Sequence, residues 1–520
     1  MKSDETGSLL YADNENNLDV PMDMKLSRLI QDLGALHVMG TLSREVTSIA
    51  SDSRKAQAGS LFVSIRGHRQ NGDHFIGDAL ARGATSFITE TEFDRLEGHH
   101  LSSNGITAVR VPDSRLALSK VSAEFYRHPS SRLNLIGITG TNGKTTLTYI
   151  LEALFGMAGQ KTGVIGTINY RYGGVKHPAS VTTPESLEIN RMLNDMAENG
   201  VESCFMEVSS HSLNLKRVHA MSFKVGVFTN LSQDHLDFHG SMESYIQDKK
   251  DLFRANQVEK RVLNIDDPVG REILNESSTE TLTIGINHPA DITAKDCVLT
   301  EEGSRFTLQT PSGNREIFTH LLGTHNIYNL LSGAAVALFQ GISLDDIDRG
   351  MRSIDRVPGR FEQLRCGQDF GVVVDYAHTD DALKNALHAA RAVARNRVLV
   401  VFGCGGDRDP GKRPKMGKVA IDNSALAIIT SDNPRSEDPG LIIRDIQTGI
   451  PETAKENQDY IIIQDRAEAI EYAIGQARPG DLLLIAGKGH EDYQVLSTGT
   501  IHFDDREVAE VAIKKRLNID

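Results

Sequence analysis

Apolar residues gather in short runs along most of the chain, and amphipathic stretches of helix length separate these runs. In the N-terminal part, the runs Leu61–Ile65 and Thr85–Thr89 flank a helical pattern over Phe75–Arg82. Strands that alternate with helices indicate an α/β domain. We expect this first, small domain to end near Ser130.

Stronger apolar runs follow in the middle of the chain, at Leu133–Ile138, Cys204–Val208, Val225–Phe228 and Arg261–Ile265. Helix-length segments separate these runs, which is typical of a mostly parallel sheet buried on both faces. A third set begins after Val357–Arg360, at Gly371–Val374, Val398–Phe402, Leu426–Ile429 and Leu482–Ala486. The pattern therefore predicts two further α/β domains.

The predicted organisation is a three-domain α/β chain behind a polar tail. The expected limits are 1–23 for the tail, 24–130 and 131–356 for the first two domains, and 357–520 for the third. The length of 520 residues fits three or four domains, each large enough to bury its own core. We find no internal repeat, which disfavours a solenoid, and we assign the tail no function.

Composition narrows the functional classes. Hydrophobic residues make up 39% of the chain and charged residues 24%, as in ordinary globular proteins, and the net charge is −14. An acidic protein is a poor general binder of nucleic acid or anionic membranes. The four cysteines form no C-x-x-C pair, and no apolar run reaches the roughly 20 residues of a membrane span. We expect a cytoplasmic protein without stable membrane insertion.

The sharpest motif is Gly137-Ile138-Thr139-Gly140-Thr141-Asn142-Gly143-Lys144-Thr145-Thr146, which follows an apolar strand and precedes a helical pattern. Glycines allow backbone N–H groups to converge on phosphate oxygens, a lysine reaches the β- and γ-phosphates, and a threonine hydroxyl can bind Mg²⁺. The motif predicts a site for a nucleoside triphosphate. A glycine-rich turn before a helix is the alternative.

This motif and the strings below resemble the Mur ligases, ATP-dependent amide-forming enzymes that build the peptide stem of peptidoglycan. The resemblance covers about residues 24–510. It implies a UDP-sugar-binding N-terminal domain, a central P-loop ATPase domain with a mostly parallel sheet, and a C-terminal Rossmann-like domain that brings the amino acid. The ATP-binding residues it implies are Gly140, Thr141, Asn142, Gly143, Lys144, Thr145, Thr146, Asn326, Arg360 and Asp375.

The resemblance also implies the catalytic residues, which are Lys144, Glu207, His235 and Lys249. Mg²⁺ would be held by Thr145, Glu207, His235 and a Lys249 carbamylated by CO₂. Only an uncharged amine attacks CO₂, so this role requires a lysine whose pKa is lowered. Lys250 is the neighbour that competes for the assignment, and a solvated helix lysine is the alternative for both.

Two further sets of residues resemble the substrate-binding residues of one branch of the family, the branch that adds the third residue of the peptide stem. The UDP-sugar dipeptide would contact Ser51, Ser53, His68, Arg69, Gln70, Thr182, Thr183, Ser209 and Arg217. Diaminopimelate would contact Arg408, Asp432, Asn433, Pro434, Arg435, Gly487 and Glu491. A guanidinium such as that of Arg435 can pair with the distal carboxylate of meso-diaminopimelate, which L-lysine lacks. An Asn-Pro turn is the alternative for this string.

The resemblance therefore implies an ATP-dependent ligase that adds meso-diaminopimelate to UDP-N-acetylmuramoyl-L-alanyl-D-glutamate through an acyl phosphate. Mg²⁺ and the carbamate on Lys249 would assist, and we expect a monomer. Three rivals stay open: the same ligase using L-lysine, a folylpolyglutamate synthase, and a nucleotide-regulated binding protein that performs no ligation.

Overall fold

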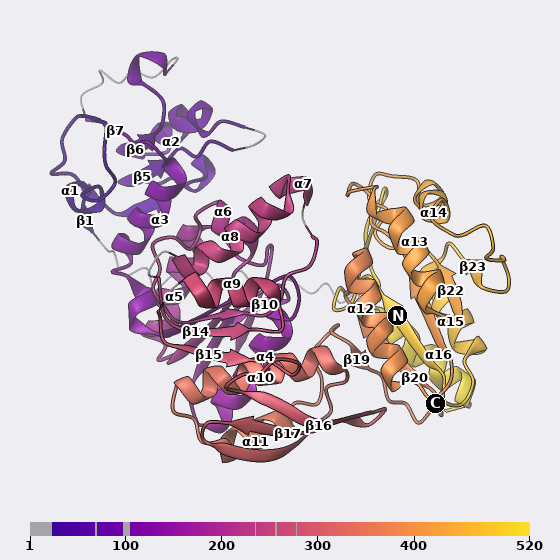
Figure 1. The fold of residues 1–520 in the computed structure, drawn as a ribbon. Helices are drawn as coiled ribbons and strands as arrows, with labels where there is room; N and C mark the ends of the chain where they lie inside the picture. The colour runs from indigo at the N-terminus through magenta and orange to yellow at the C-terminus, as the bar shows by residue number, and fades with distance from the viewer. Residues whose placement is uncertain are drawn as a thin grey trace, which may run out of the picture. The chain divides into compact units, whose positions relative to one another are not determined.

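The computed structural model describes residues 23–67, 70–96, 105–234, 236–254, 257–276 and 278–519. The chain divides into two compact units, one up to His128 and one from Pro129. Figure 1 shows the helices and strands of both units. Each unit is described by itself.

The first unit is built on a five-stranded sheet in the order β2-β7-β6-β5-β4. Strands β4 to β7 are parallel, and β2 is an antiparallel edge strand. The strands of the unit are β1 (Met24–Lys25), β2 (His37–Met39), β3 (Glu45–Val46), β4 (Ser48–Ala50), β5 (Ser60–Val63), β6 (Ser86–Thr89) and β7 (Thr107–Arg110). Its α-helices are α1 (Leu26–Leu29), α2 (Ile76–Ala81) and α3 (Ser114–Phe125).

The second unit begins with an eight-stranded sheet in the order β11-β10-β9-β12-β8-β13-β14-β15. The six strands from β9 to β15 in this order are parallel, while β10 and β11 form an antiparallel extension. The strands are β8 (Asn134–Thr139), β9 (Thr162–Ile165), β10 (Asn169–Tyr172), β11 (Val175–Pro178), β12 (Ser203–Glu207), β13 (Phe223–Phe228), β14 (Val258–Asn264) and β15 (Thr281–Ile284).

Helices cover both faces of this sheet, and the middle residues of its central strands are accordingly apolar and buried. The helices are α4 (Lys144–Met157), α5 (Ser186–Glu198), α6 (Ser210–Asn214), α7 (Leu236–His239), α8 (Met242–Arg254), α9 (Pro268–Glu276), α10 (Thr324–Phe339) and α11 (Leu344–Ser353). Helix α10 approaches α4 closely because a Cβ at Gly333 would lie 2.6 Å from Ile150 Cγ2. The small residues of α10 thus allow tight packing of α10 against α4.

An antiparallel sheet of β16 (Thr293–Thr300), β17 (Gly303–Thr310) and β18 (Gly313–Thr319) precedes α10.

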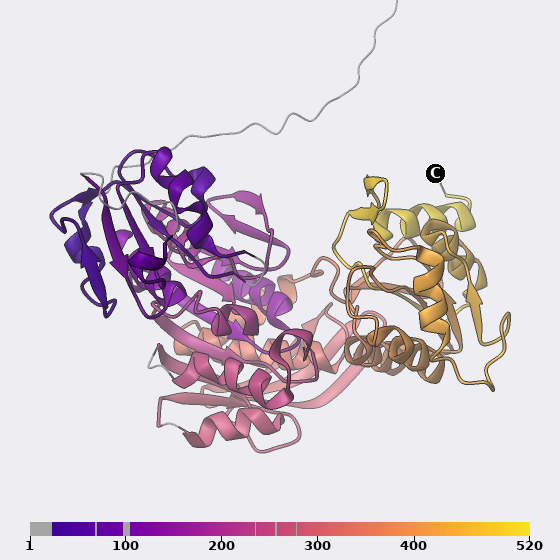
Figure 2. The same ribbon diagram turned by 90° about the horizontal axis from the view of Figure 1, so that it is seen from above.

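The last part of the chain forms a six-stranded sheet in the order β19-β20-β24-β21-β22-β23, parallel except for β19. Its strands are β19 (Glu362–Gln363), β20 (Gly371–Asp375), β21 (Val398–Phe402), β22 (Leu426–Ile429), β23 (Tyr460–Ile462) and β24 (Leu482–Ala486). Helices α12 (Asp380–Val393), α13 (Lys412–Asn423) and α14 (Pro439–Gln447) pack on one face (Figure 2). Helices α15 (Arg466–Gln476) and α16 (Asp505–Leu517) pack on the other, and β25 (Tyr493–Leu496) forms a hairpin with β26 (Gly499–His502).

The α/β class predicted from the sequence is confirmed, including the mostly parallel central sheet. Each predicted strand lies within a few residues of an observed one; for example, the run Leu133–Ile138 corresponds to β8. Pattern predicts the existence of a strand better than its ends, because the ends depend on hydrogen bonds to neighbouring strands. The limits near residues 130 and 356 stay predictions. Within the described residues, no helix is both long enough and apolar enough to span a bilayer.

Candidate functional site

The phosphate loop, residues 137–146, joins β8 to the first turn of α4. Gly140 and Gly143 have φ angles of +144° and +89°, which residues with a side chain rarely adopt. A Cβ at Gly140 would lie 2.0 Å from Thr229 Oγ1, and one at Gly143 would lie 2.4 Å from Asn329 Oδ1. Backbone conformation and close neighbours therefore both require glycine. The loop presents the N-terminus of α4, where N–H groups and the helix dipole favour an anion.

Two lysines converge on this loop, the half-buried Lys144 and the buried Lys249. Lys144 Nζ donates hydrogen bonds to the carbonyl oxygens of Gly140 and Thr141, both at 2.8 Å. Lys249 Nζ, which α8 supplies, donates to the same Gly140 oxygen at 2.8 Å. Burial, assisted by the nearby charge of Lys144, lowers the pKa of Lys249 well below its ordinary value. The loop therefore holds one amine that loses its proton more readily than an ordinary lysine.

Lys250 points elsewhere. Its Nζ pairs with Glu272 Oε2 at 2.6 Å and with Glu276 Oε1 at 2.9 Å, both on α9. Successive helix residues are rotated by about 100°, so Lys249 and Lys250 project from different faces of α8. Of the two lysines, Lys249 is the one in contact with the phosphate loop.

A chain of buried polar groups anchors α8 beside Lys249. His239 Nδ1 lies 2.7 Å from Asp248 Oδ2, and His239 Nε2 lies 2.9 Å from Ser210 Oγ. Asn214 Nδ2 also donates to Asp248 Oδ1 at 3.1 Å. These bonds connect α7 and α8 to α6, which starts just beyond the end of β12. The sequence prediction did not include them, because their partners lie far apart in the chain.

Glu207, at the carboxyl end of β12, is 1% exposed, and hydroxyl groups surround its carboxylate. Its Oε2 accepts hydrogen bonds from Thr145 Oγ1 at 3.0 Å and from Thr167 Oγ1 at 2.9 Å. The backbone N–H of Thr167 donates to Oε1 at 2.9 Å. Thr167 was missed by the sequence prediction, although its place just after β9, a neighbour of β12, was a possible signal. The buried carboxylate and the Thr145 hydroxyl offer oxygen ligands that suit Mg²⁺.

The remaining predicted nucleotide residues of the central part lie around the same loop. Thr146 is buried in the first turn of α4, and Asn142 donates its N–H to Asn230 Oδ1 at 3.0 Å. Asn326 Oδ1 accepts from Asn329 Nδ2 at 3.1 Å, and the Oδ1 of Asn329 faces Gly143. Asn326 therefore reaches the loop through Asn329, which lies one turn further along α10.

Arg360 and Asp375 come from the last part of the chain. Arg360 Nη2 donates to Thr145 Oγ1 at 3.2 Å, and its guanidinium carbon lies 4.7 Å from the centre of the Tyr376 ring. Asp375 holds the adjoining turn, because its Oδ2 accepts from the N–H of Phe361 at 2.7 Å. Burial raises the pKa of Asp375. Arg360 thus meets the first turn of α4, as the prediction of a shared nucleotide site requires.

A second group of predicted residues lies beside Glu207. Thr183 Oγ1 donates to the Glu207 carbonyl oxygen at 2.8 Å and lies 3.2 Å from Ser209 Oγ. Arg217 Nη1 donates to the Thr183 carbonyl oxygen at 2.8 Å. Thr182 Oγ1 lies 3.1 Å from Thr167 Oγ1. The residues predicted to hold the dipeptide therefore form one polar surface next to the candidate metal ligands.

The Asp432–Arg435 loop follows β22, at the carboxyl end of the last sheet. Asn433 Nδ2 donates to Glu491 Oε2 at 2.8 Å, and burial raises the pKa of Glu491. Arg435 Nη1 donates to the Gly406 carbonyl oxygen at 2.8 Å. The loop and Glu491 therefore place five of the seven predicted amino-acid contacts in two neighbouring segments.

The other predicted residues of this group vary in placement. A Cβ at Gly487 would lie 3.4 Å from Asp432 Oδ2, so this glycine lies beside the Asp432–Arg435 loop. Pro434 packs against Gly406, where a Cβ would lie 1.9 Å from the Pro434 carbonyl oxygen. Arg408 is exposed and donates to the carbonyl oxygen of Asp407 at 3.0 Å. Its predicted role rests on the sequence alone.

In the first unit, Ser51 and Ser53 lie on either side of Asp52, which accepts the N–H of Arg54 at 3.0 Å and starts a short 3-10 turn. The carbonyl oxygen of Gln70 accepts from Gly67 N–H at 3.0 Å. Two predicted contacts, His68 and Arg69, lie outside the described residues, as does His235. Among the described residues, no three His, Cys, Asp or Glu side chains gather in a metal-binding cluster.

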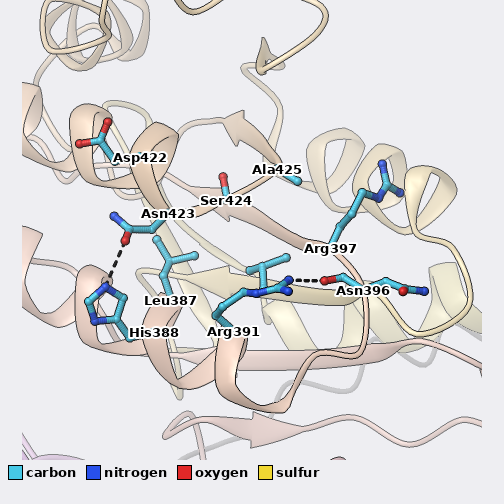
Figure 3. Close-up of a pocket in the computed structure, with 10 residues that line it drawn as sticks. Leu387, His388, Arg391, Asn396, Arg397, Asp422, Asn423, Ser424 and Ala425 are labelled. Carbon is cyan, nitrogen blue, oxygen red and sulfur yellow. Dashed lines mark hydrogen bonds between the residues drawn. The ribbon is translucent and has the colours of Figure 1, made fainter.

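A cavity of about 410 Å³ lies at the opposite, amino-terminal end of the last sheet, between α12, α13 and the start of β21 (Figure 3). It contains none of the predicted residues. Its polar groups bond to one another: His388 Nε2 lies 3.1 Å from Asn423 Oδ1, and Arg391 donates to the carbonyl oxygen of Asn396. Arg397 pairs with Asp481 at 2.6 Å. We therefore assign the chemistry to the carboxyl ends of the sheets.

Comparison with protein families matches three parts of the chain. Residues 45–126 match the model described as Mur ligase family, catalytic domain, and residues 138–337 match the Mur ligase middle domain. Residues 359–489 match the Mur ligase, glutamate ligase domain. Together the models confirm the predicted three-domain architecture.

Individual relatives align over nearly the whole chain. A UDP-N-acetylmuramoyl-L-alanyl-D-glutamate--2,6-diaminopimelate ligase of Geobacillus kaustophilus is 44% identical over 95% of this chain and 100% of its own length. The enzyme of the same name from Geobacillus thermodenitrificans is 45% identical with the same coverage. A solved structure of a ligase of that name superposes with a TM-score of 0.69 at 30% identity, covering 95% of this chain and 99% of the other.

Proposed function

The chain belongs to the Mur ligase family, and from this premise we infer that it joins meso-diaminopimelate to UDP-N-acetylmuramoyl-L-alanyl-D-glutamate, an ATP-dependent step of peptidoglycan synthesis. ATP would phosphorylate the γ-carboxylate of the D-glutamyl residue. The amine of diaminopimelate would then attack the acyl phosphate, lose its proton, and displace inorganic phosphate as the amide forms. Phosphorylation is needed because a free carboxylate resists attack by an amine.

One observation carries this proposal. Lys144, Lys249 and Glu207 converge on the phosphate loop, and Arg360 reaches the same loop from the part of the chain that bears the Asp432–Arg435 loop. Phosphoryl transfer is accelerated mainly by positioning and by stabilising charge on the transferred group. The cationic side chains of Lys144 and Arg360, together with the N-terminus of α4, meet that requirement.

Mg²⁺ use is implied by the family, and the residues of the site fit the ion. Thr145 and Glu207 present oxygen atoms, and Lys249, once carbamylated, would add an anionic oxygen in place of an ammonium. His235 is the fourth predicted ligand. Bound Mg²⁺ would neutralise charge on the phosphates during transfer.

Carbamylation of Lys249 is supported by its surroundings. The amine is buried, it lies close to Lys144, and both effects favour its neutral form. Once modified, its negative charge would meet the ammonium of Lys144 instead of opposing it. Burial thus favours the neutral amine that reacts with CO₂, and the ammonium of Lys144 would stabilise the carbamate that forms.

The acceptor and the amine would meet beside Glu207. Thr183, Ser209 and Arg217 would bind the dipeptide, where a guanidinium and hydroxyls suit carboxylates. Arg435 would pair with the distal carboxylate of diaminopimelate, and Glu491 would meet an ammonium group. The nucleotide-sugar contacts Ser51, Ser53, His68, Arg69 and Gln70 complete the proposal. Cytoplasmic location and the monomeric state stay predictions.

The test measures phosphate release with ATP, Mg²⁺ and the UDP-linked dipeptide, in the presence of meso-diaminopimelate, of L-lysine, or of no amine. Product mass identifies the tripeptide. Phosphate release that depends on diaminopimelate supports the proposal. Preference for lysine would overturn the role of Arg435 but keep the ligase, and ATP hydrolysis without a peptide product would favour the nucleotide-regulated binding protein.

A further inference from the structure

The Asp432–Arg435 loop depends on one strand of the β25–β26 hairpin for its shape. Gln494 Nε2 donates to the Asp432 carbonyl oxygen at 2.7 Å. The next residue, Val495, donates its N–H to Asn433 Oδ1 at 2.9 Å and accepts from the N–H of Arg435 at 3.0 Å. Two successive residues of β25 thus bind three residues of the loop.

We propose that Gln494, together with the backbone of Val495, is a positioning clamp that sets the geometry of the Asp432–Arg435 loop and so the selectivity for diaminopimelate over lysine. The inference rests on the proposed function. It assigns a role to the hairpin, which would not itself touch the substrate.

The loop needs external support because its conformation is unfavourable. Arg435 has a φ of +54°, in the left-handed region that costs energy for a residue with a side chain. Such a conformation persists only where surrounding bonds fix it. The Arg435 N–H bond to Val495 and the Nη1 bond to Gly406 fix the backbone and the guanidinium respectively.

The clamp also explains why a polar residue is buried in the hairpin. Gln494 is 8% exposed, whereas all four residues of the opposite strand, β26, are exposed. A buried amide is tolerated when it is hydrogen-bonded, and here its partner is the Asp432 main chain. Removing the amide would leave the Asp432 carbonyl oxygen unsatisfied and free the start of the loop.

The same loop carries the groups that would recognise the amine. Asn433 is held by Val495 through its Oδ1, which directs its Nδ2 to Glu491 Oε2 at 2.8 Å. Among the described residues, the buried Asp432 Oδ1 has no hydrogen-bond partner, so it can accept a bond from a ligand. A shift of the clamp would therefore move Asp432, Asn433 and Arg435 together.

Selectivity should suffer more than binding in general. Diaminopimelate would bind through the amino-acid end that it shares with lysine and through its distal carboxylate, which would pair with Arg435. Lysine lacks that distal carboxylate. A shift of Asp432 and Asn433 would affect both amines, whereas loss of the Arg435 position adds a penalty that only diaminopimelate pays. ATP and the UDP-linked dipeptide would bind elsewhere, so their KM values should not move.

The test compares the wild type with Gln494→Met, which keeps the side-chain length and removes the amide. Thr500→Ala is the matched control, because it alters the exposed strand of the same hairpin opposite Val495. Steady-state kinetics are measured with diaminopimelate and with L-lysine. For Gln494→Met we expect the KM for diaminopimelate to rise about tenfold and the ratio of kcat/KM values, diaminopimelate over lysine, to fall about tenfold. The KM for ATP should stay within about twofold.

An unchanged ratio in Gln494→Met, or an equal loss with both amines, would overturn the clamp. If this variant does not fold, Gln494→Glu decides in the same way, since it keeps the shape and replaces the donor by a carboxylate. Failure of the wild type to form tripeptide would instead reject the proposed function. If the wild type and Gln494→Met both prefer diaminopimelate to the same extent, the clamp is rejected and the proposed function stands.

Discussion

Lys144 and Lys249 donate hydrogen bonds to the same carbonyl oxygen, that of Gly140, each at 2.8 Å. Lys249 is buried and Lys144 is half-buried, and loss of solvation lowers the pKa of each amine. Two ammonium groups at one loop oppose each other, so the site favours a state in which one of them is neutral or modified. In the proposed function, Lys144 keeps its charge for the phosphates and Lys249 becomes the carbamate.

Replacement of Lys249 should therefore abolish ligation without damage to the fold. For Lys249→Met we expect kcat to fall on the order of 10³-fold, because charge stabilisation at the transferred phosphoryl group is lost. Thermal unfolding should occur at an equal or higher temperature, since a buried polar amine is replaced by an apolar side chain of similar length. Lys250→Met is the control. It should keep its activity and lose about 1 kcal/mol of stability, because its pairs with the exposed Glu272 and Glu276 are lost. Equal activity loss in both variants would contradict the assignment.

Carbamylation should follow the lowered pKa of Lys249. As the pH rises through that lowered pKa, the amine loses its proton and becomes reactive toward CO₂, whereas an exposed lysine is still protonated. Protein incubated with ¹³C-bicarbonate near neutral pH should show a carbamate carbon resonance, and Lys249→Met should not. The resonance should weaken as the pH is lowered. A signal that persists in Lys249→Met would place the modification elsewhere.

Thr167 should tune the candidate metal site. Thr167→Val keeps the shape of the side chain but removes the hydroxyl that donates to Glu207 Oε2 at 2.9 Å. Because groups that orient a ligand affect metal affinity, we expect the half-saturating Mg²⁺ concentration to rise roughly tenfold. Thr162→Val, at the other end of β9, should leave the Mg²⁺ dependence unchanged. A Thr167→Val enzyme with the wild-type Mg²⁺ curve would separate Glu207 from metal binding.

Arg435 should decide between diaminopimelate and lysine. Among the described residues, the Arg435 side chain makes two hydrogen bonds, and both use Nη1 as the donor. The other nitrogen atoms of the guanidinium can therefore face a carboxylate. Arg435→Ala should lower kcat/KM for diaminopimelate by about 10²-fold or more, because a site built for a charged group loses its partner. The KM for ATP should not change. Retained preference for diaminopimelate would refute the pocket assignment.

The ion pair between Arg466 and Asp505 should be essential for stability. Both side chains are fully buried, and their two bonds measure 2.7 Å each. Asp505→Ala would strand a buried guanidinium, which costs about 3–5 kcal/mol. Denaturant unfolding should show this loss in the second unit. The exposed pair Lys418–Asp422 offers the comparison, and Lys418→Met should cost less than about 1 kcal/mol. Similar losses in the two variants would mean that burial does not matter here.

The sequence alone determined those features that depend on residues close together in the chain. The phosphate loop was recognisable because glycine spacing, lysine and threonine must follow one another directly for the backbone to enclose a phosphate. The buried strands were recognisable because parallel strands covered on both faces require continuous apolar runs. The Asp432–Arg435 string and the family resemblance were likewise local.

Tertiary structure decided which side chains meet across long sequence separations. Adjacent in sequence, Lys249 and Lys250 are alike by pattern, and only the packing of α8 sends one to Gly140 and the other to α9. Thr167 reaches Glu207 because β9 and β12 are neighbours in the sheet, and Gln494 reaches Asp432 because a hairpin folds back under the loop. Such contacts depend on the three-dimensional path of the chain, which no short pattern encodes.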